Sequence, residues 1–420
     1  MIEILVSGFF LSLGLTYKKK INPLVVFNGI WFICFFLYRL GFSSAYDNKI
    51  PFLVSIVFVS MLITFNVGFI LGKSLKNKRG IVLKISLIKA RTKEEYLNIV
   101  FHIYFSLIII EVILFKGVPL LWTLQGRTDV SYVTFGIPSL HGFINSLAWF
   151  IVSISFIEFL NSKSKVALRN IILINLIFVL LLARQSMVTE IIQLMTIYFC
   201  KRRLEVKKLC VLLLLFVIGF GLIGNLRTPP EVIIRNSGFR FNVPIFLLGI
   251  VWVYMYMISP IANIIYFIEN FTNFQYGIFS LINLLPTVVV NRINITTRGE
   301  VGTYLVNEAF NMSTGLMPIY GDFGVIGIAL FFTFIGLMGG VLWRKMRCSN
   351  YSDEIVCMYS IYSGAIALMF FFNEFITLPI IIQFIYSSLL FRNYFYCRNK
   401  NDHKEIINSY IDLKPVSNIK

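Results

Sequence analysis

Residues 318–343 read PIYGDFGVIGIALFFTFIGLMGGVLW, and the residues just after them include Arg344, Lys345 and Arg347. The run contains a single charged side chain, Asp322, and it is longer than the roughly 20 residues that a helix needs to cross a bilayer. Positive residues at the end of a membrane helix mark the cytoplasmic side. The stretch therefore predicts a membrane helix that ends in the cytoplasm.

Similar apolar runs follow one another along the whole chain of 420 residues. The composition is 57% hydrophobic and 14% charged, with a mean hydropathy of +0.80, whereas a soluble protein of this length needs more polar surface. We expect an all-α, polytopic integral membrane protein with about eleven transmembrane helices. The expected spans are 2–16, 24–42, 51–72, 99–115, 141–160, 170–183, 186–200, 209–224, 318–343, 355–373 and 375–391.

The net charge of +18 is concentrated in every second connection between these runs. We interpret this alternation as an orientation signal and not as the mark of a nucleic-acid partner. It predicts an N-terminus outside, a C-terminus in the cytoplasm and a cytoplasmic tail over residues 392–420. The basic connections begin near Lys18, Lys73, Lys163, Lys201, Arg344 and Arg392.

Residues 225–317 form the one long connection predicted on the outer side, between an N-terminal bundle (1–224) and C-terminal helices (318–391). Within it, residues 244–268 are apolar enough to span, but a single crossing would move the later basic clusters outside. We favour a segment that lies flat or re-enters, because its aromatic rings suit a membrane interface. The alternative is a hairpin in which residues 276–290 cross back.

Six cysteines are present, without a CxxC pair or a Cys/His ligand cluster, and this topology places none in an external loop. We predict no disulfide and no metal site. The chain also lacks a phosphate-binding glycine loop and a dinucleotide fingerprint, so ATP-driven transport has no support and no cofactor is expected.

Gly336 and Gly340 have the GxxxG spacing that lets two membrane helices approach closely. This spacing is common in membrane helices, and we interpret it as close packing within the chain and not as a site for a partner.

Arginines stand out on the outer side, because arginine there works against the orientation signal. The guanidinium group is suited to bidentate binding of phosphate, so the set predicts an anionic, phosphate-type ligand. The alternative for each one is an ion pair, as Arg184 could form with Glu190, or contact with lipid headgroups. The external arginines are Arg127, Arg184, Arg227, Arg235, Arg240, Arg292 and Arg298.

Three external carboxylates are candidates for acid–base chemistry. Glu300 and Glu308 are eight residues apart and would share one face of a helix. Asp322 lies where its helix enters the membrane, so it is a candidate base or a helix N-cap. His141 is the one external histidine, and its place near a helix start is typical of a structural role.

Four short stretches occur in a familiar order. They are Ala183-Arg184-Gln185-Ser186, Asn225-Leu226-Arg227, Thr297-Arg298-Gly299-Glu300 and the run from Pro318-Ile319-Tyr320-Gly321-Asp322 to Gly327. This order resembles the O-antigen polymerase (Wzy) family, the oligosaccharide repeat-unit polymerases of Gram-negative bacteria. The resemblance covers the topology of nearly the whole chain, and its motifs lie within about 180–330.

The resemblance implies a membrane glycosyltransferase of the GT-C type in the inner membrane. Its substrates would be undecaprenyl-diphosphate-linked oligosaccharides, joined on the periplasmic face without a metal, beside a flippase and a chain-length regulator. Arginines would stabilise the leaving diphosphate, and one carboxylate would accept the proton of the attacking hydroxyl. The residues so implied are Arg184, Arg227, Arg298, Arg292 and Arg127 for the diphosphate, and Glu300, then Glu308, then Asp322 for the base.

Three alternatives remain open from the sequence. A lipid-linked oligosaccharide flippase is disfavoured by the long outer module, since short loops are expected on both sides of a transporter. An O-antigen ligase relies on a histidine in its outer loop, and residues 225–317 contain none. A non-catalytic membrane scaffold is the third.

Overall fold

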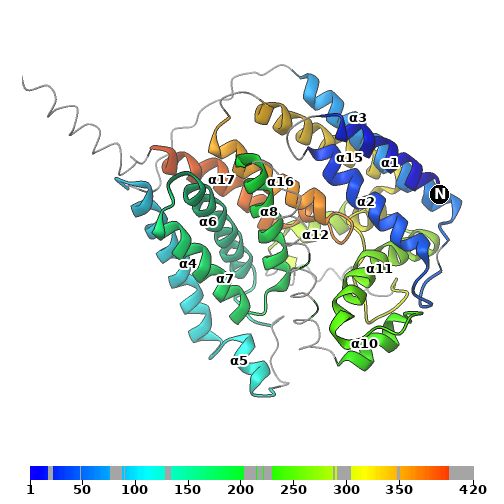
Figure 1. Ribbon diagram of the computed structural model, residues 1–420, viewed down its shortest axis with the longest axis horizontal. Coiled ribbons are helices and arrows are strands. Elements are labelled where there is room, and N and C mark those ends of the chain that lie inside the picture. The colour runs from blue at the N-terminus through cyan, green and yellow to red at the C-terminus, as the bar shows by residue number, and fades with distance from the viewer. Residues whose placement is uncertain are drawn as a thin grey trace, which may run out of the picture. The chain divides into compact units, whose positions relative to one another are not determined.

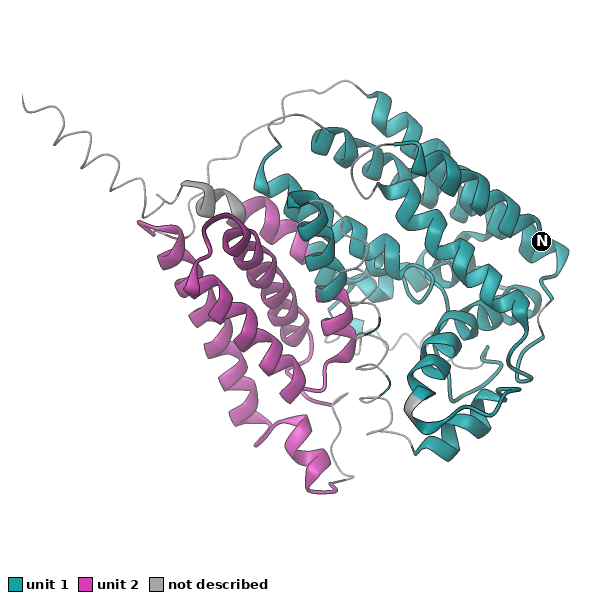
Figure 2. Ribbon diagram, viewed as in Figure 1, with its two compact units in different colours: residues 1–77, 191–381 teal, residues 78–190, 382–420 magenta. Residues whose placement is uncertain are grey.

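The computed structural model describes residues 1–17, 22–47, 49–75, 88, 90–127, 134–202, 214, 221, 229–286, 289–290, 304–347 and 351–396, apart from the side chains of 246 and 391–396. The described residues are helical and form no strand, only one isolated bridge between Ser43 and Phe239. The chain divides into two compact units (Figure 2): residues 1–77 with 191–381, and residues 78–190 with 382–420.

Each unit is built from helices that are distant in sequence. Unit 1 contains α1 (Ile2–Leu15), α2 (Pro23–Leu40), α3 (Phe52–Ser74), α10 (Pro230–Ser237), η1 (Ile245–Leu247), α11 (Leu248–Asn270), α12 (Ile278–Leu284), α15 (Met317–Arg347), α16 (Asp353–Leu368) and η2 (Glu374–Ile376). Unit 2 contains α4 (Lys93–Leu114), α5 (Pro119–Leu124), α6 (Leu140–Ser162) and α7 (Lys165–Leu180). Helices α8 (Arg184–Lys201) and α17 (Leu378–Tyr396) have residues in both units.

The helical membrane-protein class predicted from the sequence is confirmed. Within the described residues, six helical segments are long and apolar enough to cross a membrane by length and composition. They are Pro23–Leu40, Phe52–Ser74, Lys93–Leu124, Leu140–Ser162, Leu248–Asn270 and Met317–Arg347. The count of eleven spans and the GT-C fold stay predictions.

The other expected spans fall on helices that are shorter or more polar, and 209–224 lies almost wholly outside the described residues. Helices α1, α7 and α16 have 14, 16 and 16 residues. Helix α8 has 18 residues, but its buried side includes a polar stripe at helical spacing. The stripe consists of Ser186, Thr189, Glu190, Gln193 and Thr196.

Helices α3 and α15 pack along each other in parallel, and glycines let their backbones touch (Figure 1). A Cβ added to Gly336 or Gly340 would overlap a carbonyl oxygen of α3, and one added to Gly68 or Gly72 would overlap a carbonyl oxygen of α15. Both helices therefore carry a GxxxG pair at the contact. This confirms the interpretation of Gly336 and Gly340 as sites of close packing, and it explains why unit 1 combines residues 1–77 with residues from the later part of the chain.

Helix α11 covers the segment that the sequence placed flat or re-entrant. It has 23 residues, packs against α2, and 78% of its most apolar window is buried. A helix lying on a membrane surface keeps one polar face exposed. This burial is therefore that of an interior helix and not of a helix lying flat. The returning half of the alternative hairpin, 276–290, contains α12 of only seven residues, which is too short to cross, so the hairpin is not shown.

Contacts at the two ends of unit 1 join segments that the charge alternation predicts on the same side of the membrane. Lys73 donates to the hydroxyl of Tyr17 (2.9 Å), so two segments predicted on the basic side meet. On the predicted outer side, the Ser44 amide donates to the carbonyl of Gly238 (2.8 Å), and the Arg240 amide donates to that of Phe42 (2.9 Å). The start of the long outer connection thus lies against the turn after α2.

Candidate functional site

The helices of unit 2 also have two chemically different ends. At one end, Lys93 lies 3.6 Å from the Glu158 carboxylate, and the Ser164 hydroxyl donates to Glu94 (2.9 Å). These contacts join the start of α4 to the end of α6 and the start of α7, so α4 and α6 are antiparallel. At the opposite end, α4 finishes, α6 begins, α7 meets α8, and α5 packs against α7. We name this second end the α5 end.

A buried carboxylate and a histidine form a hydrogen-bonded pair at the α5 end. The Glu111 side chain has no exposed surface, and its Oε2 lies 2.8 Å from Nδ1 of His141. Its other oxygen accepts a hydrogen bond from the backbone amide of Ile137 (2.9 Å). The carboxylate therefore holds both the histidine and the loop before α6 against the last turn of α4.

Aromatic rings surround the Glu111–His141 pair. The ring of Phe135 meets His141 edge to face, with centroids 5.6 Å apart, and Trp122 of α5 packs on Phe135 at 6.0 Å. The guanidinium of Arg127 lies 5.9 Å from the centroid of the Trp122 ring, and Arg127 is exposed. A cation over a tryptophan face is attracted by the ring quadrupole. Arg127 is thus placed at the surface close to the Glu111–His141 pair.

Arg184 opens α8 at the same α5 end. The chain turns tightly here: Leu182 has a positive φ of 53°, and the Arg184 amide donates to the Leu182 carbonyl (2.9 Å). The start of α8 is fixed to α6, because the Trp149 indole donates to the carbonyl of Ser186 (3.1 Å). Two of the arginines predicted to bind a diphosphate, Arg127 and Arg184, therefore belong to one end of one unit.

Glu190 does not pair with Arg184, the alternative that the sequence left open. Its Oε1 accepts a hydrogen bond from the Asn175 amide group (2.6 Å) of α7, and the residue is 2% exposed. Its Oε2 has no hydrogen-bond partner within the described part of the chain. That alternative came from spacing along α8 alone, whereas the hydrogen-bond partner of Glu190 lies on the neighbouring helix.

Asp322 in unit 1 is a helix cap, but of a different helix from the one the sequence suggested. Its Oδ1 accepts from the amide of Phe279 (2.9 Å), and its Oδ2 accepts from the amide (2.8 Å) and hydroxyl (2.6 Å) of Ser280. These amides open α12, and Asp322 is fully buried. Both carboxylate oxygens are thus occupied by the protein.

Glycines around Asp322 allow this arrangement. A Cβ on Gly321 would come within 2.6 Å of the Phe279 ring. Gly324 has φ 60° and ψ −147°, a conformation open to glycine but not to other residues, and it kinks α15 against Phe274. The motif from Gly321 to Gly324 is accounted for by packing and capping.

Glu308 lies in a loop of unit 1 and is exposed. The loop is held by Asn263 of α11, whose amide group donates to the carbonyls of Phe310 (2.9 Å) and Met312 (2.7 Å). Asn307 donates to the carbonyl of Asn236 (2.9 Å) in the last turn of α10. Glu308 is therefore presented on an ordered loop at the surface.

The remaining predicted site residues fall outside the described residues: Arg227, Arg292, Arg298 and Glu300. The external arginines Arg235 and Arg240 are described, and both are exposed on and just after α10 in unit 1. Of the predicted site residues, the structure thus describes Arg127 and Arg184 in unit 2, and Glu308 and Asp322 in unit 1.

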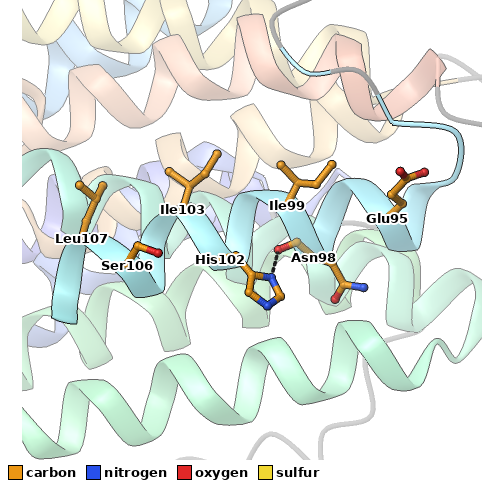
Figure 3. A pocket seen from close by; sticks show the side chains of 7 residues that line it. All are labelled: Glu95, Asn98, Ile99, His102, Ile103, Ser106 and Leu107. Atoms are coloured by element: carbon orange, nitrogen blue, oxygen red, sulfur yellow. Dashed lines mark hydrogen bonds between the residues drawn. The ribbon is translucent and has the colours of Figure 1, made fainter. Parts of the chain in front are cut away.

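An open cleft of about 570 Å³ runs along α4 outside this site (Figure 3). His102 and Asn98 point to one side of the helix there, and Nδ1 of His102 lies 2.6 Å from the Asn98 carbonyl oxygen. Seven residues of one helix face line the cleft, and none of them was predicted to act on a substrate. They are Glu95, Asn98, Ile99, His102, Ile103, Ser106 and Leu107.

Sequence reasoning missed the Glu111–His141 pair. His141 was assigned a structural role because no partner could be seen, and Glu111 was counted only as part of an apolar run. A carboxylate inside a membrane helix is itself a signal for function, and it could have drawn attention to this position.

Metal-binding geometry is not found in the part of the chain that the structure describes, where no three His, Cys, Asp or Glu side chains converge. The described cysteines Cys34, Cys200 and Cys357 are buried free thiols.

Comparison with known proteins adds no relative: no family model, no curated protein and no solved structure matches this chain.

Proposed function

We propose that this membrane protein polymerises oligosaccharide units carried on a lipid diphosphate, as the resemblance to O-antigen polymerases implies. The enzyme is a metal-independent glycosyltransferase of the bacterial inner membrane that acts on the periplasmic face. Its substrates are undecaprenyl-diphosphate-linked repeat units, and its partners are the bilayer and, in the cell, a flippase and a chain-length regulator.

The observation that carries the proposal is the pair of arginines at the α5 end of unit 2. Arg127 and Arg184 lie at the end opposite Lys93 and Lys163, which the charge alternation assigns to the cytoplasm. The guanidinium group is suited to bidentate binding of phosphate, which is the chemistry that a lipid diphosphate presents near the membrane surface.

The reaction needs few groups beyond these. A hydroxyl of one repeat unit attacks the reducing-end carbon of the growing chain, and the bond from that carbon to the diphosphate oxygen breaks. The electron pair leaves with the diphosphate, whose negative charge the guanidinium groups stabilise. The hydroxyl proton passes to one general base.

The sequence nominated three carboxylates for that base, in the order Glu300, Glu308 and Asp322. Glu300 stays a prediction, because it lies outside the described residues. Glu308 is exposed and open to a substrate. Asp322 has both oxygens engaged by α12, which supports capping over proton transfer.

The lipopolysaccharide banding pattern of a strain lacking this gene tests the proposal. We expect a core that carries a single repeat unit, and return of the long ladder when the wild-type gene is restored. A bare core would contradict polymerisation and indicate a ligase or a flippase.

A flippase is the second candidate, and Glu190 is the observation that favours it. A buried carboxylate in a helix of a membrane protein, here with one oxygen lacking a hydrogen bond to any described residue, is typical of proton-coupled transport. Vesicles with purified protein and a labelled lipid-linked repeat unit separate the two. Transfer of label across the bilayer without polymer would favour the flippase.

The orientation is part of the proposal and has its own test. In a variant without native cysteines, we expect a cysteine at Gln125 to react with an impermeant reagent from the periplasm, and one at Ser162 to be protected. Both positions are exposed, and they lie at opposite ends of unit 2. Labelling of both from the same side would contradict the orientation.

A further inference from the structure

The Glu111–His141 pair holds an imidazole with one nitrogen bound and the other open. Because a carboxylate only accepts hydrogen bonds, Nδ1 of His141 donates to Glu111 at 2.8 Å, and in the neutral ring Nε2 is left as an acceptor. No described residue forms a hydrogen bond with Nε2. The His141 side chain is 26% exposed, whereas Glu111 is completely buried.

The ring cannot easily turn away from this orientation. Phe135 packs against it edge to face, and a Cβ on Gly136 would come within 2.5 Å of its Cγ. Glu111 is itself held by the Ile137 amide at 2.9 Å. A buried carboxylate that fixes the tautomer and direction of an exposed imidazole is the arrangement that general bases use.

We infer that His141 is the general base of the reaction, with Glu111 as its positioning residue. The inference rests on the proposed function. As the acceptor hydroxyl oxygen forms its bond to the reducing-end carbon, its proton moves to Nε2 of His141. The bond from that carbon to the diphosphate breaks in the same step, and His141 later releases the proton to water.

The surroundings of His141 fit this role. Arg127 and Arg184 belong to the same end of unit 2, so one end holds cations for the leaving diphosphate and a base for the attacking hydroxyl. An imidazole changes protonation closest to neutral pH, and bases near the working pH are the most effective. Among the described residues, the charged side chains at the α5 end are Glu111, Lys116, Arg127 and Arg184, with Glu190 further along α8. Lys93, Glu94, Glu95 and Glu158 lie at the opposite end of α4 and α6.

The test uses full-length protein in proteoliposomes and, as substrate, lipid-linked repeat units extracted from a strain that lacks the gene. We expect His141→Gln to lower kcat about 100-fold with KM nearly unchanged, since a general base contributes at least that much. The matched control is His102→Gln, an exposed histidine of α4 whose Nδ1 meets only a backbone carbonyl, and it should retain wild-type kcat. Thermal unfolding of both variants checks that they fold.

A pH profile separates catalysis from a purely structural role. Wild-type kcat should fall at acidic pH, because a protonated imidazole cannot accept a proton, and the residual activity of His141→Gln should lack this acid limb. Glu111→Gln should lower kcat at least tenfold and change the pH profile. A glutamine side chain has only one acceptor oxygen, so it cannot accept from both the Ile137 amide and His141.

The outcomes distinguish the inference from the function it rests on. Wild-type kcat in His141→Gln would overturn the inference, and with an inactive Glu300→Gln it would return the base to that carboxylate. If His141→Gln does not fold, His141→Ala with added imidazole replaces it: return of turnover supports the inference and its absence overturns it. A wild-type protein that makes no polymer overturns the proposed function itself.

Discussion

Asp322 in unit 1 and Glu111 in unit 2 are both buried carboxylates, yet their surroundings differ in kind. Asp322 accepts three hydrogen bonds, all from the first residues of α12. Glu111 accepts one from the backbone and one from His141, whose ring reaches the surface. A buried carboxylate that is bonded only to buried groups supports the fold. A buried carboxylate that orients a partly exposed imidazole can influence a reaction at the surface.

The largest effect expected from this comparison is that of Asp322→Ala. The change leaves the amides of Phe279 and Ser280 buried without an acceptor, and each such donor costs about 1–3 kcal/mol. We expect a loss of about 3 kcal/mol or more, seen as low yield in the membrane and a lower unfolding temperature in detergent. Normal stability would show that Asp322 is not a structural cap.

Arg184→Ala should come next, with polymer abolished while the protein still reaches the membrane. The reason is loss of a guanidinium that we propose binds the diphosphate, and Lys should restore activity only in part because it lacks the bidentate fork. Arg227→Ala should behave similarly, and Arg298→Ala should weaken the product.

Arg235→Ala is the matched control, since Arg235 is an exposed arginine of α10 in unit 1. Polymer length on gels and the amount of protein in the membrane are the readouts. Near-normal polymer from Arg184→Ala would remove the α5 end from the proposed site.

A paired amide exchange at the two carboxylates sharpens the comparison. Asp322→Asn keeps an acceptor for Phe279 but leaves the Ser280 amide facing an NH₂ group, so we expect a stability loss of about 1–3 kcal/mol with activity retained. Glu111→Gln should lose a similar amount of stability, about 1–3 kcal/mol, because one buried donor loses its acceptor, but its turnover should fall at least tenfold. Unfolding temperature and turnover per folded protein measure both. A similar turnover in Asp322→Asn and Glu111→Gln would mean that the two carboxylates share one role.

The sequence predicted the helices well because apolar runs and basic connections are local signals. The α3–α15 contact was only half visible: Gly336 and Gly340 were noticed, but the partner pair at Gly68 and Gly72 is far away in the chain. The length of α8 was visible too, whereas its buried polar stripe depends on which face packs inward.

The candidate site was less predictable because its contacts link distant segments. A cap at Asp322 could be expected from its position, but the helix it caps begins more than forty residues earlier. His141 looked structural because Glu111 lies 30 residues away on another helix. Pairing between helices is set by packing, which residue spacing along one helix does not reveal.

The smallest effect is expected from Glu308→Gln. Glu308 is exposed, and the hydrogen bonds that hold its loop come from Asn263 and Asn307, so the change should leave stability within about 0.5 kcal/mol. If the base lies at the α5 end of unit 2, polymer yield should stay within about twofold of wild type, because an exposed glutamate then has no proton to accept. The readout is turnover in proteoliposomes across the pH range used for His141→Gln. A loss as large as that of His141→Gln would move the base to the unit 1 loop, where the sequence had placed it, and would leave the Glu111–His141 pair as a tether for the loop before α6.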